Sequence, residues 1–205
     1  MTTTGNGRGG AVSATIPGAD VYLLGNVTPE GGLLTDIRRG VPVVLVGMTP
    51  NAIIEESENR VSVLQKSGLE ALLKAEYTNA SLVVSNMQEH RSTYNMNNML
   101  SAEPIPFVIT SLPGFLNPVV KVIDDDNCNI SGKVYPPGAA SEYRNSTTVA
   151  AGVYNYKGND IPMTIIVNNV FGKGGAQIYY RMIANAIFAY ASGINAYNDA
   201  GKRRD

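Results

Sequence analysis

The 205-residue sequence contains one histidine, one cysteine and no tryptophan. A zinc site built on His and Cys needs three or four such ligands, so His90 and Cys128 cannot form one. A Ser-His-Asp or Cys-His centre would have to use His90, which lies in the polar stretch QEHRS. No G-x-S-x-G motif is present, and Cys128 stands beside acidic residues that disfavour a reactive thiolate. We therefore expect no catalytic activity.

Charge is also scarce. Only 16% of the residues are charged, and 16 basic and 17 acidic side chains leave a net charge of −1. This balance provides no field that would gather nucleic acid or an anionic membrane. The chain carries 21 Gly and 20 Asn instead. Because uncharged polar groups are desolvated at lower cost than ions, such a surface favours packing against other protein.

The first residues contain no apolar run of the kind that forms a signal peptide, so we expect synthesis in the cytoplasm without export. Residues 1–19 lack periodicity and are rich in Gly and Thr, which predicts a flexible arm before a single domain over 20–205. A match to G-x-G-x-x-G at residues 5–10 lacks the preceding strand and the following helix of a dinucleotide site. We interpret it as part of the arm.

The hydrophobic pattern predicts an α+β fold. Apolar, β-branched runs at 20–27 and 41–48 indicate strands, and Thr49-Pro50 and a capping box at Ser67 and Glu70 indicate a short helical segment near 50–77. From residue 107 onward, short β-type runs alternate with Pro-Gly and Asp/Asn-rich turns, which is typical of antiparallel hairpins or a meander. A long C-terminal helix over 176–198 is expected to pack on this body.

The stretch that precedes this helix is the first candidate site. Gly172, Lys173, Gly174 and Gly175 stand between a predicted strand and a predicted helix, the order in which phosphate-binding loops occur. The P-loop pattern requires Ser or Thr after the lysine and a longer glycine spacing, and neither is present. We interpret the glycines mainly as a turn, with anion binding through Lys173 as the alternative.

An oxygen-rich stretch at 124–129 is a weak calcium candidate. Asp125, Asn127 and Asn129 follow the first positions of an EF-hand loop, but Ile130 replaces its glycine and Pro136 its closing glutamate. Asp and Asn are also common turn residues, so a hairpin turn explains the stretch. We expect no metal and no cofactor.

The C-terminal helix is almost uncharged, since Arg181 is the one charged residue between 176 and 198. Its polar residues interrupt it too often for a membrane span, so we expect none. A helix that is apolar on nearly every side is buried, either by its own sheet or partly by a neighbouring subunit. The candidates for contact with a neighbour are Ile178, Met182, Ala186, Tyr190, Ile194, Tyr197, Ala189 and Gly193.

These features favour a self-assembling structural subunit of a homo-oligomeric particle without catalytic activity, such as a capsid, neck or tail component of a virus or phage virion. The expected partners are further copies of the chain and other structural proteins, with no sequence-specific binding of nucleic acid. The alternative is a protein or enzyme that binds a small anion or nucleotide at 172–175. An adaptor that contacts its partners through residues 88–104 is a third possibility.

Overall fold

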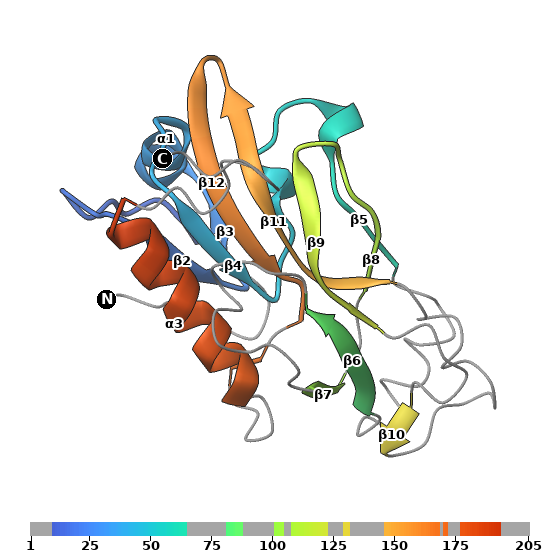
Figure 1. Ribbon diagram of the computed structural model, residues 1–205. Coiled ribbons are helices and arrows are strands. Elements are labelled where there is room, and N and C mark those ends of the chain that lie inside the picture. The colour runs from blue at the N-terminus through green and yellow to red at the C-terminus, as the bar shows by residue number, and fades with distance from the viewer. Residues whose placement is uncertain are drawn as a thin grey trace, which may run out of the picture.

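The structure is a computed structural model that describes residues 10–64, 81–87, 101–104, 108–122, 129–131, 146–168, 170–171 and 177–193. It is a mixed α+β fold with a sheet as its body and few helices, which confirms the predicted class (Figure 1). Residues 1–9 of the predicted arm, the helix predicted at 67–77, His90 and Cys128 lie outside the described residues.

One large mixed sheet and one small sheet contain all the described strands. Along the large sheet the strand order is β10 (Asn129–Ser131), β6 (Ser81–Met87), β9 (Leu116–Val122), β11 (Thr147–Tyr156), β12 (Asn159–Ile166), β4 (Val43–Val46) and β2 (Tyr22–Gly25). Three further strands join it: β7 (Ser101–Pro104) pairs with β6, and β8 (Val108–Ser111) pairs with β11 and with β5 (Ser62–Leu64). The small sheet pairs β1 (Ala11–Val12) with β3 (Thr28–Pro29).

The strands β2, β4 and β12 are parallel to one another, which differs from the wholly antiparallel body that the sequence predicts. Between β2 and β4 the chain forms the helix α1 (Gly31–Arg38), so this part is a β-α-β unit. All four residues of β4 are fully buried. Such an uninterrupted apolar run is typical of a parallel strand that is covered on both faces.

The other half of the sheet is antiparallel, as the sequence predicts. Strand β11 pairs antiparallel with both β9 and β12. The β11–β12 hairpin turns at Lys157 and Gly158, whose φ angles of 51° and 92° fit the two-residue type I′ turn of tight hairpins. The Asn155 side chain accepts a hydrogen bond from the Gly158 backbone at 3.1 Å, which holds the turn.

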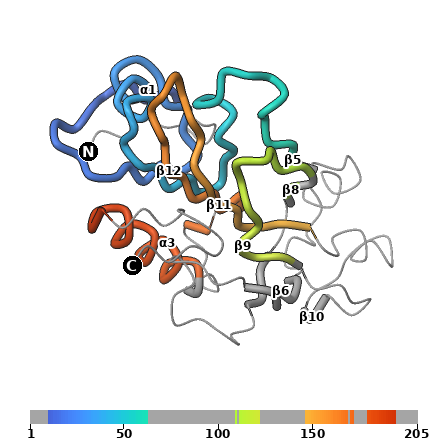
Figure 2. Tube along the Cα trace, turned by 45° about the horizontal axis from the view of Figure 1, so that its top comes forward, coloured from blue at the N-terminus to red at the C-terminus, as the bar shows by residue number. Residues whose placement is uncertain are grey.

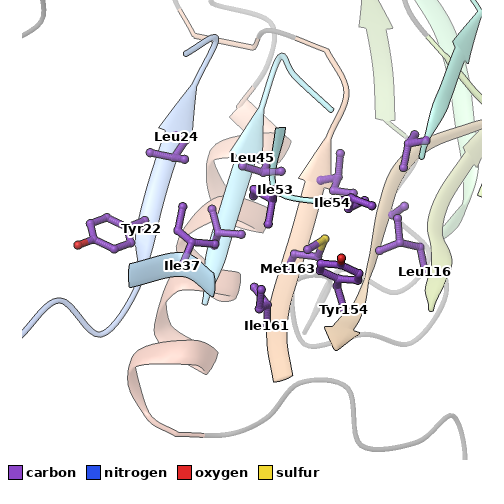
Figure 3. Close-up of a cluster of buried hydrophobic side chains, with 14 of the residues drawn as sticks. Tyr22, Leu24, Ile37, Leu45, Ile53, Ile54, Leu116, Tyr154, Ile161 and Met163 are labelled. Carbon is purple, nitrogen blue, oxygen red and sulfur yellow. The ribbon is translucent and has the colours of Figure 1, made fainter. Parts of the chain in front are cut away.

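Two apolar clusters cover the two faces of the sheet. Residues of β4 alternate between them: Val43 and Leu45 face the cluster that contains α1, and Val44 and Val46 face the cluster that contains α3 (Gln177–Ala191). Figure 3 shows the first cluster, where side chains from β2, β4, β12 and α1 meet Ile53 and Ile54. Figure 2 shows β12 running between α1 and α3, so we call these the α1 face and the α3 face.

The described helices differ in detail from the predicted ones. Two short 3-10 helices, η1 (Pro50–Ala52) and η2 (Ser57–Asn59), lie where a helical segment is expected, and Thr49 and Pro50 begin the first as predicted. The helix α1 was not predicted, because its first two residues are glycines, the poorest helix formers after proline. Leu33 and Ile37, which are buried, give it a face toward the sheet.

Candidate functional site

Most of the predicted contact residues of the C-terminal helix that the structure describes face the chain's own sheet. Met182, Ala186, Ala189 and Tyr190 are buried, and three of them belong to the apolar cluster of the α3 face. Gly193 is exposed just beyond the helix, with a φ of 66°. This placement matches the alternative in which the sheet buries this helix, and contact of these residues with a neighbour stays a prediction. The side chain of Ile178 and residues Ile194 and Tyr197 lie outside the described part.

Two tyrosines of α3 carry polar groups into this apolar cluster. The Tyr190 hydroxyl lies 2.8 Å from the Thr164 hydroxyl on β12, and burial raises the pKa of Tyr190. The Tyr179 hydroxyl is buried and has no hydrogen-bond partner. An unpaired buried hydroxyl is unfavourable, so the Tyr179 hydroxyl does not stabilise the packing of α3 on the sheet. The hydrogen bond of Tyr190 does.

A further apolar side of α3 is exposed. Phe188 has 71% of its surface exposed and Tyr180 40%, and Ala184 and Ala191 are also exposed. At 100° per residue, these four side chains span about 80° of the helix circumference, beside the buried face. Arg181 and Ser192 border this flank, about 20° and 40° beyond Phe188 around the helix. The helix therefore presents one continuous uncharged flank to solvent.

This flank adjoins the edge of the sheet. The Tyr180 hydroxyl donates a hydrogen bond to the Val170 carbonyl at 3.1 Å, and the next residue, Phe171, lies against Gly25 of β2. A Cβ on Gly25 would stand 2.7 Å from the Phe171 ring, so glycine leaves room for that ring. Leu23, two residues earlier and on the same face of β2, is 42% exposed. Figure 1 shows α3 crossing beside β2 and β4.

We call the exposed apolar residues of this region the edge surface. They are Leu23, Phe171, Tyr180, Ala184, Phe188 and Ala191. None of them is among the contact residues predicted from the sequence, although the spacing of Tyr180, Ala184 and Phe188 by four residues is a signal that could have identified the helical part. Leu23 of β2 belongs to the edge surface only because β2 lies at the end of the sheet, and the sequence does not specify that position.

A group of charged and aromatic side chains lies at the tip of the β11–β12 hairpin. Glu55 pairs with Arg38 at 3.2 Å and with Lys157 at 3.4 Å, and it accepts a hydrogen bond from the Tyr156 hydroxyl at 2.8 Å. The Tyr156 hydrogen bond, followed by the two cations, lowers the pKa of Glu55. Both cations also lie over the Tyr156 ring, 4.7 and 4.8 Å from its centre.

The neighbouring carboxylate, that of Glu56, also accepts a hydrogen bond from a tyrosine of β11. Glu56 accepts a hydrogen bond from the Tyr154 hydroxyl, which lowers the pKa of Glu56, while burial and this carboxylate raise the pKa of Tyr154. Arg38 also donates two hydrogen bonds to the Ile53 carbonyl, at 3.1 and 3.2 Å. These groups satisfy one another, so the hairpin-tip cluster joins α1, residues 53–56 and the hairpin rather than presenting free groups for acid–base chemistry.

The remaining candidate sites fall mostly outside the described residues. This applies to Gly172, Lys173, Gly174 and Gly175, and to Asp125 and Asn127, whereas Asn129 is the first residue of β10. Within the described ranges, no three His, Cys, Asp or Glu side chains are grouped as a metal site requires. No helix in the described part of the chain is long and apolar enough to cross a membrane.

Comparison with known proteins gives no family assignment. No family model matches the chain, and no curated protein matches it.

Proposed function

We propose that the chain is a self-assembling structural subunit of a homo-oligomeric particle and that the edge surface is where it meets other protein. One observation carries the proposal: an exposed, uncharged apolar flank of α3 that adjoins β2, the strand whose outer side pairs with no other strand in the described part of the chain. Contiguous apolar surface of this kind on a folded protein commonly marks a contact site.

The size of the exposed side chains supports this role. Phe188 has 71% of its surface exposed although it lies on a helix whose other face is fully buried. Covering such a side chain contributes on the order of 2 kcal/mol, so a contact that covers the whole edge surface would supply a substantial driving force for association. Large aromatic residues in the centre of a contact commonly contribute most of its affinity.

The particle is of the kind found in virions, a capsid, neck or tail component, with further copies and other structural proteins as partners. The composition supports this assignment: charged residues are few, Gly and Asn are abundant, and the chain has a single His and a single Cys. Abundant uncharged polar residues suit a surface that becomes buried on assembly.

Molar mass measured by size-exclusion chromatography with light scattering, over a wide concentration range, tests the proposal. We expect masses above that of one chain, and images of the concentrated protein should show rings, tubes or shells. Phe188→Glu places a charge on the flank and should lower the mass measured at a given concentration. Ser111→Glu, at an exposed position of β8 outside the edge surface, is the matched control and should assemble like the wild type. A wild-type protein that stays monomeric at every concentration would refute the proposal.

A further inference from the structure

The strand β2 lies at one end of the sheet with one side unpaired. The backbone N–H of Tyr22 donates to the Pro42 carbonyl at 2.9 Å, and that of Asn26 donates to the Val46 carbonyl at 3.1 Å. Because hydrogen bonds alternate sides along a strand, the N–H and C=O groups of Leu23 and Gly25 point away from β4. Among the described residues, no strand pairs with that outer side.

This edge is short, at four residues, but β2 itself has no charge, proline or bulge that would prevent pairing with a strand of another chain. Natural edge strands commonly carry lysine, proline, a bulge or an inward-pointing charge. The sequence of β2 is Tyr-Leu-Leu-Gly, and its register with β4 runs without interruption from Tyr22 to Gly25. The edge is thus regular and uncharged, with Leu23 half exposed beside it.

We infer that two copies of the chain join through their β2 strands, which pair antiparallel across a two-fold axis and place the two α3 flanks against each other. This inference rests on the proposed function and specifies its first contact. An isologous contact requires a surface that complements itself. An uncharged strand edge and an uncharged helix flank meet that requirement, because two like surfaces bring no like charges together.

The exposed apolar side chains provide a large part of the area that a specific dimer needs. A whole aromatic side chain presents about 150–250 Å², so the exposed parts of the four large apolar side chains of the edge surface amount to roughly 400 Å² per copy. Two copies contribute roughly 800 Å² from these side chains alone. The alanines of the flank and the paired backbones extend the contact toward the total of about 1,200 Å² at which specific interfaces begin.

The inference also limits what this contact can build. A two-fold contact closes on itself, so it gives a dimer with one continuous sheet and no larger ring or tube. Assembly of a particle from such dimers would use a second surface of the chain. The β2–β2 dimer is therefore the building unit of the particle and not the particle itself.

Amide hydrogen exchange at Leu23 and Gly25 tests the inference in the unmodified protein. Both amides should exchange rapidly in dilute, dissociated protein and become protected in the assembled protein, because pairing occupies both N–H groups. If the protein assembles while both amides exchange as fast as in dilute solution, the β2 pairing is refuted and the proposed function stands. If both amides are already protected in a monomer, the chain covers its own edge and the inference is also refuted. A protein that never assembles refutes both proposals.

A pair of substitutions separates the backbone from the side chain. Leu23→Pro removes an N–H that points away from β4, and proline is tolerated at such positions of edge strands. We expect it to raise the dissociation constant of the dimer roughly 100-fold, since the loss occurs twice across the axis. Leu23→Thr, which keeps the N–H and suits a strand, should weaken the dimer less than Leu23→Pro. Equal affinities for the wild type and Leu23→Pro would overturn the inference.

Discussion

The two faces of the sheet are covered to different degrees. On the α1 face, α1 and residues 50–61 cover the strands, and polar contacts hold this cover at several points, such as the two hydrogen bonds between Asn51 and Val61. On the α3 face, the described cover is the helix α3 with Val170, and a buried hydrogen bond between the Tyr190 and Thr164 hydroxyls joins the helix to the sheet.

Among the described residues, the difference is clearest at the two faces of β2. The α1 face leaves no large apolar side chain of β2 exposed, since Tyr22 and Leu24 are both buried there. On the α3 face of the same strand, Leu23 stays 42% exposed beside the flank of α3. Among the described residues, the same four-residue strand is therefore covered on one face and partly exposed on the other, and the exposed face belongs to the proposed contact surface.

The largest effect is expected on the α1 face, where packing is tightest. A Cβ on Gly152 would lie 1.8 Å from the Phe115 carbonyl oxygen, so Gly152→Ala forces the backbones of β9 and β11 apart. We expect it to lower the free energy of unfolding by about 3 kcal/mol or more, measured by urea denaturation. Gly114→Ala is the matched control, since no atom lies within 4 Å of its added Cβ. Similar losses for both variants would contradict this account of the packing.

The next effect comes from the polar contacts that hold the cover of the α1 face. Asn51 donates to the Val61 carbonyl at 3.0 Å and accepts from the Val61 N–H at 2.9 Å. Asn51→Ala leaves both backbone groups without this partner and should lower the free energy of unfolding by about 2 kcal/mol. Asn117→Ala, at an exposed position of β9, should change it by less than about 0.5 kcal/mol. A loss at Asn51 no larger than at Asn117 would be the contradicting result.

A smaller effect is expected on the α3 face. Tyr190→Phe removes the hydroxyl that lies 2.8 Å from Thr164 and leaves the apolar contacts of the ring in place. We expect a loss of about 1–2 kcal/mol in the free energy of unfolding, because the Thr164 hydroxyl stays buried without this partner. The double variant Tyr190→Phe with Thr164→Val should recover part of the loss. A double variant less stable than Tyr190→Phe alone would contradict this explanation.

The smallest effect concerns pH. The hydrogen bond from Tyr156, together with Lys157 and Arg38, lowers the pKa of Glu55 below its ordinary value. A lowered carboxyl pKa adds stability above the unfolded-state pKa, and this contribution is lost as pH falls through the folded-state pKa. Between about pH 5 and pH 3, the wild type should therefore lose more stability than Glu55→Gln. Parallel pH profiles from thermal unfolding would exclude this contribution.

The sequence predicted the elements with strong local signals. The all-apolar stretch around β4 and the Lys-Gly turn of the β11–β12 hairpin lie as expected, and the α+β class follows from them. It missed α1, because this helix begins with two glycines, which are poor helix formers. Leu33 and Ile37 stabilise α1 by packing against the sheet, and this contact cannot be read from the local sequence. It also missed the parallel pairing of β12 with β4, because residues 120 positions apart in the chain, such as Val43 and Met163, leave no local signal of their contact.

The edge surface could not be predicted from the sequence either, because it depends on contacts between distant parts of the chain. The spacing of apolar residues identifies α3 as a helix with little charge, but not which of its sides the sheet covers. The structure places Met182 and Ala186 against the sheet and leaves Phe188 exposed. The position of β2 at the end of the sheet depends on pairing among distant strands, so the joint surface of β2 and α3 exists only in the folded chain.

Hydroxyl-radical footprinting of the unmodified protein at low and high concentration tests the central claim most directly. The account predicts that Phe188 and Tyr180, now 71% and 40% exposed, become protected as the concentration rises. Tyr156, at the hairpin tip, should stay equally reactive and serves as the internal reference. Unchanged reactivity of Phe188 and Tyr180 in a protein whose mass shows assembly would contradict the claim that the edge surface is the site of contact.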